Sequence, residues 1–208
     1  MTDKQIELWR SEFGEKYASR DANLISEENQ RRLIRDWAKI LHNAISPRPA
    51  SALEVGCNVG RNLVALRNFV SELHGVEPNS KVCDEARQNP VLAEATIKEG
   101  VSQDLPYADS SIDLVFTSGV LIHIAPDNLG KAVDEIVRVS RRYVVCIEYF
   151  SKEPAQITYR GLDGFLFKRD FGRYYLERHP NLRVLDYGFL WQLLDSADDC
   201  NWWLFEKT

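Results

Sequence analysis

The chain has 208 residues, 44% of them hydrophobic, and a formal net charge of −5. This length fits one core of ordinary size, so we expect a single domain over residues 1–208. Nucleic-acid binders usually show a basic stripe, and membrane spans need ~20 apolar residues; the sequence shows neither. The charged start MTDKQIELWR does not resemble a secretory signal. We expect a cytoplasmic monomer or homodimer that acts on a small molecule and binds neither nucleic acid nor membrane.

Four cysteines are spread along the chain and form no CxxC pair. They are Cys57, Cys83, Cys146 and Cys200. Zinc sites need clustered cysteine and histidine ligands, and no such cluster is present. We therefore predict free, mostly buried thiols and no metal site.

Between residues 3 and 20, three aromatic side chains recur at every fourth position, which predicts a helix with an aromatic face. They are Trp9, Phe13 and Tyr17. Gly14 weakens this helix. A second helix is expected to begin near Ser26, a good N-cap, and to end before Pro47. We expect residues 1–46 to form a helical cap.

From residue 51 onward, short apolar segments alternate with amphipathic ones. Strands are predicted at 51–56, 73–78, 95–100, 111–119 and 142–150, and helices at 61–70, 80–89 and 128–140. This order, with nearly continuous apolar strands, predicts a mostly parallel sheet with helices on both faces. The core is expected to span residues 50–208.

The C-terminal part departs from this alternation. A helix is predicted at 169–179, followed by strands at 182–191 and 201–207 that a short acidic loop joins. A connection of this length indicates an antiparallel hairpin at the end of the sheet. Residues 150–168 show no clear periodicity, so we expect a long irregular loop there, of the kind that often contacts substrate.

The stretch LEVGCNVGRN, residues 53–62, joins the first strand of the core to its first helix. Ligands of open α/β sheets bind beyond the carboxyl ends of the strands. Gly56 and Gly60 let the backbone turn tightly, and Asn58 tolerates positive φ. The spacing does not match the G-x-G-x-x-G of dinucleotide-binding folds, and the Gly-Lys-Ser/Thr of a P-loop is missing.

The stretch resembles the E/D-x-G-x-G-x-G motif of class I S-adenosylmethionine (SAM)-dependent methyltransferases, with Asn58 in the middle glycine position. Glu77 stands where such enzymes keep an acid for the ribose hydroxyls. The segment EGVSQDLPYADSSIDLVFTSGVLIHI is similar to the family's G-D-A-x-x-LP-F-x-D-x-S-F-D-L-V segment. Val101 replaces the acid that usually meets the adenine, so Ser102, Gln103 or a backbone carbonyl would serve instead.

The resemblance implies an α/β, Rossmann-like, seven-stranded sheet with SAM as the cofactor. It implies these cofactor-binding residues: Glu54, Gly56, Cys57, Asn58, Gly60, Asn62, Glu77, Pro78, Ser102, Gln103, Thr117, Tyr17 and Arg20. The aromatic N-terminal helix is either a buried packing element or a lid over the methionine end of the cofactor. As a lid it would let Arg20 and Arg61 meet the cofactor carboxylate.

Nearly the whole chain is similar to the pseudaminic acid biosynthesis-associated methylases. LWRSEFGEKYASRD, GVLIHIAPDNLGKAVDEIVRVSRRYVVCIEYF and YRGLDGFLFKRDFGRYYLERHPNLRVLDYGF carry this similarity. It implies methyl transfer to a sugar of the nonulosonic acid type. Two alternatives stay open: O- or N-methylation of an amino-acid or peptide-like natural product, and a non-catalytic SAM-binding sensor or scaffold. A dehydrogenase is the least favoured.

His123 follows the fourth core strand and is the candidate general base, because histidine accepts protons near neutral pH. A packing role is the alternative. The candidate substrate-binding residues lie near the ends of the fifth strand and of the 150–168 loop. They are Glu148, Tyr149, Tyr159, Arg160 and Arg169. Guanidinium groups pair bidentately with carboxylate or phosphate, so the arginines would suit an anionic substrate. Surface ion pairs are the alternative.

Overall fold

The computed structural model describes residues 4–22, 26–42, 45–195 and 198–208. The strands are β1 (Ser51–Val55), β2 (Glu72–Glu77), β3 (Thr96–Glu99), β4 (Ile112–Ser118), β5 (Ser140–Glu148), β6 (Ala155–Tyr159), β7 (Leu162–Lys168), β8 (Leu182–Leu190) and β9 (Cys200–Lys207). The helices are α1 (Lys4–Arg10), α2 (Glu12–Ala22), α3 (Glu27–Leu41), α4 (Arg61–Leu66), α5 (Ser80–Gln88), α6 (Pro126–Val139) and α7 (Phe171–Arg178). Two short 3-10 helices are η1 (Pro90–Leu92) and η2 (Leu121–His123).

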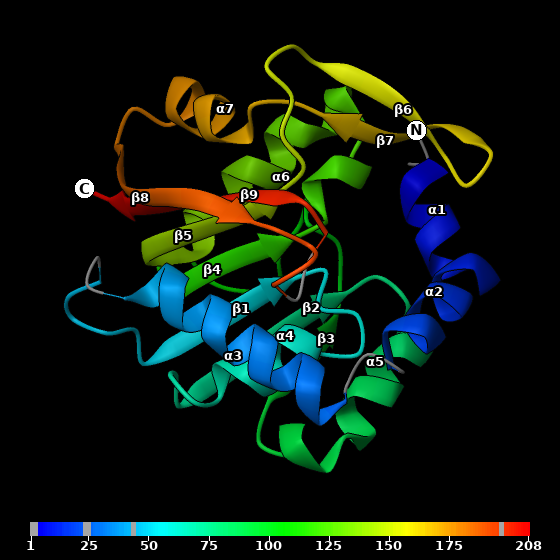
Figure 1. Ribbon diagram of the computed structural model, residues 1–208, viewed down its shortest axis with the longest axis horizontal. Coiled ribbons are helices and arrows are strands. Elements are labelled where there is room, and N and C mark those ends of the chain that lie inside the picture. The colour runs from blue at the N-terminus through cyan, green and yellow to red at the C-terminus, as the bar shows by residue number, and fades with distance from the viewer. Residues whose placement is uncertain (1–3, 23–25, 43–44, 196–197) are drawn as a thin grey trace.

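Seven strands form one sheet in the order β3-β2-β1-β4-β5-β9-β8 (Figure 1). The strands from β3 to β5 pair in parallel, and β9 runs antiparallel to both β5 and β8. The predicted α/β fold, with a mostly parallel seven-stranded sheet and an antiparallel C-terminal hairpin, is therefore confirmed. Within the described ranges, no helix is long and apolar enough to cross a bilayer.

Two hydrophobic layers cover the sheet, because successive residues of a strand point to opposite faces. In β4, Phe116 packs with α3, where the Trp37 ring meets it edge-on at a centroid distance of 4.7 Å. Its neighbour Val115 joins the opposite cluster with α6 and α7. Trp37 is 1% exposed, so α3 packs tightly against this face of the sheet. The four cysteines are free and buried, as predicted.

The N-terminal aromatic segment is two helices, not the single helix that its spacing predicted. Ser11 interrupts it: its Oγ donates to the Leu8 carbonyl at 2.7 Å and accepts from the Phe13 N–H at 3.2 Å. A serine at this position caps α2 and ends α1. The bend needs Gly14, since a Cβ there would lie 1.9 Å from the Trp9 carbonyl oxygen.

The segment 150–168, expected to be irregular, forms a two-stranded hairpin from β6 and β7. Tyr159 pairs with Leu162 across a two-residue turn, in which Arg160 and Gly161 have φ of 50° and 80°. Positive φ at both positions is the type I′ pattern, whose usual sequences are Asn-Gly and Asp-Gly. The expectation was wrong because Arg-Gly does not carry that turn signal. The hairpin stands beside α1 (Figure 1), where Gln5 Nε2 donates to the Gly164 carbonyl at 2.9 Å.

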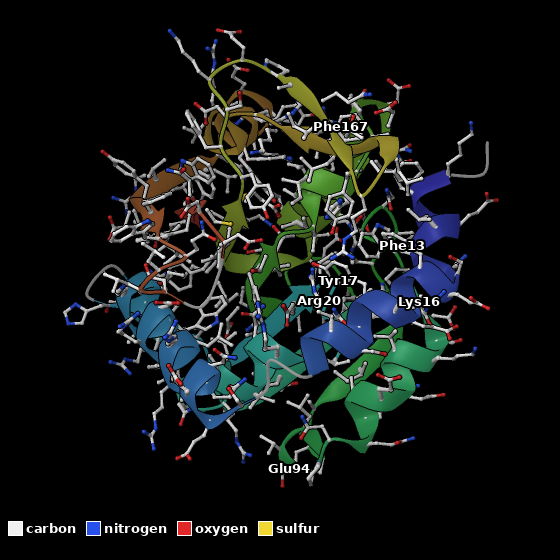
Figure 2. The ribbon with its side chains drawn as sticks, turned by 45° about the vertical axis from the view of Figure 1, so that its right-hand side comes forward. Phe13, Lys16, Tyr17, Arg20, Glu94 and Phe167 are labelled. Atoms are coloured by element: carbon white, nitrogen blue, oxygen red, sulfur yellow. The ribbon has the colours of Figure 1, made fainter. Side chains whose placement is uncertain are left out.

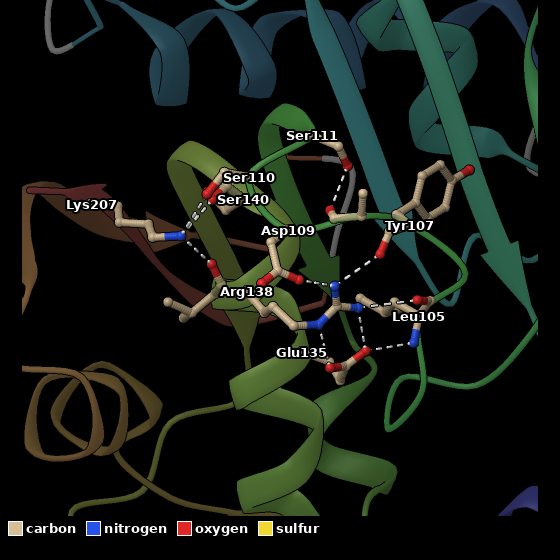
Figure 3. Close-up of polar contacts among 11 residues, drawn as sticks. Leu105, Tyr107, Asp109, Ser110, Ser111, Glu135, Arg138, Ser140 and Lys207 are labelled. Atoms are coloured by element: carbon tan, nitrogen blue, oxygen red, sulfur yellow. Dashed lines mark hydrogen bonds and ion pairs between the residues drawn. The ribbon is translucent and has the colours of Figure 1, made fainter.

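Arg138 of α6 holds the loop that precedes β4 (Figure 3). Its guanidinium donates to Glu135 at 2.6 Å, to Asp109 at 2.7 Å, and to the carbonyls of Tyr107 and Leu105 at 2.9 and 3.2 Å. Glu135 also accepts the Leu105 N–H at 2.8 Å. The loop that leads from β3 to β4 is therefore anchored to α6 through the paired side chains of Arg138 and Glu135.

Arg138→Met is expected to lower the free energy of unfolding by about 1–3 kcal/mol, because Glu135 and the two loop carbonyls lose their donors. Urea denaturation measures this change. The matched control is Arg173→Met, which removes an exposed pair with Glu177 on α7 and should leave the urea midpoint unchanged. Equal effects of the two substitutions would contradict an anchoring role for Arg138.

Candidate active site

A cavity of about 300 Å³ opens beyond the carboxyl ends of the central strands. Its walls come from the turn after β1, the end of β2, the loops that follow β3 and β4, the helices α1 and α2, and the β6–β7 hairpin. This is the edge at which open α/β sheets bind their ligands, because glycine-rich turns and helix N-termini meet there.

The turn after β1 is left-handed at three positions: φ is 76° at Gly56, 51° at Asn58 and 79° at Gly60. The predicted positive φ of Asn58 is confirmed. The N–H groups of Gly56 and Cys57 donate to the Val76 carbonyl at 2.7 and 3.0 Å, which ties the turn to β2. This arrangement carries the backbone along the cavity wall, and it requires glycine at position 56, because a Cβ there would lie 2.6 Å from Val120 Cγ2.

Glu77 ends β2 and lines the cavity. Its two carboxylate oxygens accept the N–H groups of Asn58 and Asn79, each at 3.1 Å. Burial raises the pKa of Glu77 to about 7, and the two backbone donors act in the opposite direction. Nearby, Asn62 Nδ2 donates to the buried Glu54 carboxylate at 2.6 Å. The cavity therefore presents a buried hydrogen-bond acceptor beside the turn.

The helices α1 and α2, which form the predicted lid, cover one side of the cavity. Trp9, Tyr17 and Arg20 line the cavity, while Phe13 does not. Tyr17 and Arg20 lie on the inner side of α2 (Figure 2), with the Arg20 guanidinium carbon 4.3 Å from the Tyr17 ring centroid. Asn79 Nδ2 donates to the Trp9 carbonyl at 3.0 Å, which ties the lid to the end of β2.

His123 closes η2 and lines the cavity. Its Nδ1 lies 2.7 Å from the Phe165 carbonyl oxygen, which only accepts, so Nδ1 carries the proton and Nε2 keeps its lone pair. The ring packs against Trp9 and Tyr159 at centroid distances of 5.0 and 4.9 Å. Burial lowers the pKa of His123 to about 4, although the Phe165 bond acts against this shift. The imidazole is therefore neutral at pH 7.

Glu148 was predicted to bind substrate, but its side chain points into the protein and does not line the cavity. It is fully buried at the end of β5 and accepts three successive backbone N–H groups at 3.0–3.3 Å. These belong to Val120, Leu121 and Ile122. Burial raises the pKa of Glu148 to about 7, opposed by those donors. Glu148 thus holds η2, and through it His123, against the end of β5.

The cavity brings together most of the residues that the sequence singled out. These are Tyr17, Arg20, Glu54, Gly56, Cys57, Asn58, Arg61, Asn62, Glu77, Pro78, Ser102, Gln103, His123, Tyr149, Tyr159 and Arg160. Four predicted residues do not line it. Gly60 shapes the turn, since a Cβ there would lie 2.4 Å from the Leu92 side chain; Thr117 and Glu148 are buried in the sheet. The fourth, Arg169, stacks its guanidinium 4.9 Å from the Tyr174 ring centroid.

Sequence reasoning missed Asp198, which lines the cavity from the loop between β8 and β9. The Tyr149 hydroxyl donates to its Oδ2 at 2.5 Å. That loop contains three aspartates, Asp195, Asp198 and Asp199, and nothing in their order distinguishes the one that faces the cavity. Only the pairing of β9 with β5 brings Asp198 next to Tyr149.

Residues 53–147 match the model of the methyltransferase domain family. An uncharacterized methyltransferase of Synechocystis sp. is 30% identical over 96 residues, which cover 46% of this chain and 44% of the relative. One of Schizosaccharomyces pombe is 31% identical over 109 residues, covering 46% and 38%. The chain thus spans less than half the length of these curated relatives.

Solved structures share the fold over nearly the whole chain. The 1,6-didemethyltoxoflavin-N1-methyltransferase of Burkholderia thailandensis, with 1,6-didemethyltoxoflavin and S-adenosylhomocysteine bound, has a TM-score of 0.73 at 15% identity, and the match covers 99% of this chain and 89% of that one. Magnesium protoporphyrin IX methyltransferase from Synechocystis, with SAH bound, has a TM-score of 0.70 at 13% identity, covering 99% and 100%. The architecture is therefore the Rossmann-like methyltransferase fold.

We expect nuclear magnetic resonance to find His123 neutral, with its proton on Nδ1, down to a pKa of about 4. Because the unfolded ring titrates near 6.5, the unfolded chain takes the proton first. The contribution of this ring to stability then declines as the pH falls from about 6.5 towards 4.

Trp9→Ala should open the ring to water and raise the His123 pKa towards its ordinary value. Trp191→Ala, at an exposed tryptophan outside the cavity, is the control and should leave that pKa unchanged. A wild-type pKa near 6.5 would contradict the buried environment of His123.

Proposed function

We propose that the protein is a SAM-dependent methyltransferase that acts on a small polar molecule. The observation that carries this proposal is that two walls of one cavity differ in their chemistry. The first holds the turn after β1 and the Glu77 carboxylate, and the second holds a neutral histidine. The methyltransferase family match over residues 53–147 supports the same activity.

The residues of the first wall fit SAM. The Glu77 carboxylate suits the two hydroxyls of a ribose, and the narrow turn beside it lets the backbone approach a ligand closely. Ser102 and Gln103 line the part of the cavity that follows β3 and suit the adenine. The Arg20 guanidinium on the lid suits a carboxylate. When bound, SAM supplies an activated methyl group on a sulfonium.

On the second wall, His123 Nε2 offers a lone pair that can accept a hydrogen bond from the hydroxyl or amine of the methyl acceptor and so orient it. The bond from Nδ1–H to the Phe165 carbonyl keeps the lone pair on Nε2 and orients the ring. The three N–H groups that Glu148 accepts hold η2 in place. Glu148 is therefore a positioning residue for His123. The rings of Trp9 and Tyr159 pack against His123 and exclude water from it.

For the acceptor, we propose a sugar of the nonulosonic acid type, in which Arg160 pairs with the carboxylate. Arg160 lines the cavity from the hairpin tip, and among the described residues no carboxylate lies within ion-pair distance of it. A positive φ of 50° is unfavourable for arginine. Backbone strain of this kind is typical of positions where it orients a side chain for binding. Amino-acid or peptide-like acceptors, and a non-catalytic SAM-binding role, are the alternatives.

Glu77→Ala is expected to weaken the binding of S-adenosylhomocysteine about 10- to 100-fold, because two hydrogen bonds to a charged acceptor are lost. Isothermal titration calorimetry measures the affinity, with NAD as a comparison ligand that should not bind. The control is Glu72→Ala, which removes an exposed carboxylate at the other end of β2 and should keep the affinity within about twofold. Wild-type affinity in Glu77→Ala would refute this cofactor site.

Arg160→Asn should keep or raise the thermal midpoint, because asparagine tolerates the positive φ of the turn. The same change should raise the KM for an acidic acceptor at least about tenfold, since the guanidinium is lost. Arg160→Lys keeps the positive charge but lacks the paired N–H donors of the guanidinium, so it should give an intermediate KM. Melting curves and methyl-transfer rates over a panel of sugar acids, nucleotide sugars and small peptides measure both effects.

An unchanged KM in Arg160→Asn would contradict the assigned anion contact. If no acceptor in the panel consumed SAM while S-adenosylhomocysteine still bound, the non-catalytic alternative would be favoured.

A further inference from the structure

The cavity has a third functional wall, formed by Tyr149 at the end of β5 and Asp198 just before β9. The Tyr149 hydroxyl donates to Asp198 Oδ2 at 2.5 Å, within the range of charge-assisted O–H···O⁻ bonds. Burial, followed by the bond to Asp198, raises the pKa of Tyr149, so the phenol keeps its proton and remains the donor. Tyr149 therefore fixes one oxygen of the carboxylate and leaves Oδ1 for another partner.

Among the described residues, Oδ1 of Asp198 has no recorded partner, and Asp198 forms no ion pair within 4 Å. The Lys168 ammonium lies over the Tyr149 ring, 4.9 Å from its centroid. An exposed loop carboxylate normally keeps its mobility. Here a partly buried phenol holds it at the cavity wall, which is the arrangement of a binding group.

Opposite charges thus reach one cavity from two separate elements. Arg160 comes from the turn between β6 and β7, and Asp198 from the loop between β8 and β9. The Arg160 guanidinium carbon lies 5.6 Å from the Tyr159 ring centroid and 5.9 Å from that of Tyr17, within the range of cation–π contacts. A ligand with a single charge would pair with one of these groups, whereas a ligand that carries both an anionic and a donor group would pair with both.

We propose that Asp198, positioned by Tyr149, binds a hydrogen-bond donor of the methyl acceptor while Arg160 binds its anionic group. The acceptor is then a small acid that also carries a protonated amine or hydroxyl groups, such as an amino acid or an amino-sugar acid. This inference rests on the proposed methyltransferase function, because it assigns the acceptor half of the same cavity. Asp198 is a specificity-determining residue and takes no proton in this scheme.

The test measures binding of three probes by calorimetry to protein saturated with S-adenosylhomocysteine. The probes are D-gluconate, D-glucosaminate and sorbitol, which differ in carboxylate and amine. Wild type should bind both acids more tightly than sorbitol. Asp198→Asn should weaken D-glucosaminate at least tenfold, because the ammonium loses its counter-charge. If Asp198 binds hydroxyls of D-gluconate, the same substitution should weaken the binding of D-gluconate only about two- to threefold, because the asparagine amide oxygen still accepts hydrogen bonds from those hydroxyls.

Tyr149→Phe probes the same contact from the other side, and it should weaken the binding of D-glucosaminate at least threefold with unchanged S-adenosylhomocysteine affinity. The matched control is Asp199→Asn, next in the chain and outside the cavity, where the carboxylate accepts the Gln192 N–H at 3.0 Å. It should leave every affinity within twofold.

Wild-type affinities for both acids in Asp198→Asn would overturn the inference. So would a wild type that binds neither acid at millimolar concentration, even with S-adenosylhomocysteine bound. A protein that fails to bind S-adenosylhomocysteine at all would instead refute the proposed cofactor.

Discussion

The site depends on one buried carboxylate. Glu77 accepts the N–H of Asn58 with one oxygen and the N–H of Asn79 with the other. Asn79 in turn caps α5 through its Oδ1 and holds the lid through its Nδ2, which donates to Trp9. The turn after β1, the start of α5 and the junction of α1 with α2 are therefore joined through two neighbouring residues. Burying a charged group without these donors would be costly, so the carboxylate and the turn require each other.

The opposite wall is built on a similar principle. Glu148 gathers three backbone N–H groups and thereby fixes η2, and the Phe165 carbonyl of β7 selects the tautomer of His123. A core carboxylate thus fixes the backbone that leads to His123, and a carbonyl of the hairpin fixes the orientation of its ring. Because the hairpin is also tied to α1 through Gln5, hydrogen bonds link the lid, the hairpin and the histidine into one structure.

Much of the candidate site could be predicted from the order of the sequence motifs. A glycine-rich turn after an apolar strand, followed by an acid at the end of the next strand, has a local mechanism in backbone conformation and in the edge geometry of parallel sheets. The β6–β7 hairpin could not be predicted, because Arg160 occupies a turn position where asparagine or aspartate is the usual residue. The helix break at Ser11 was also not predicted, because the regular spacing of the aromatic residues indicated one continuous helix, whereas Ser11 caps the second one.

The sequence by itself determined the α/β class, the strand and helix alternation, the left-handed Asn58 and the ends of β1 and β2 where the cavity opens, because each follows from local periodicity or from φ. Only the tertiary structure decided that Glu148 faces inward, that His123 is desolvated between aromatic rings, and that Asp198 meets Tyr149. Those facts depend on contacts between residues far apart in the chain. Burial and hydrogen-bond partners set the charge state of a side chain, and neither is encoded in its immediate neighbours.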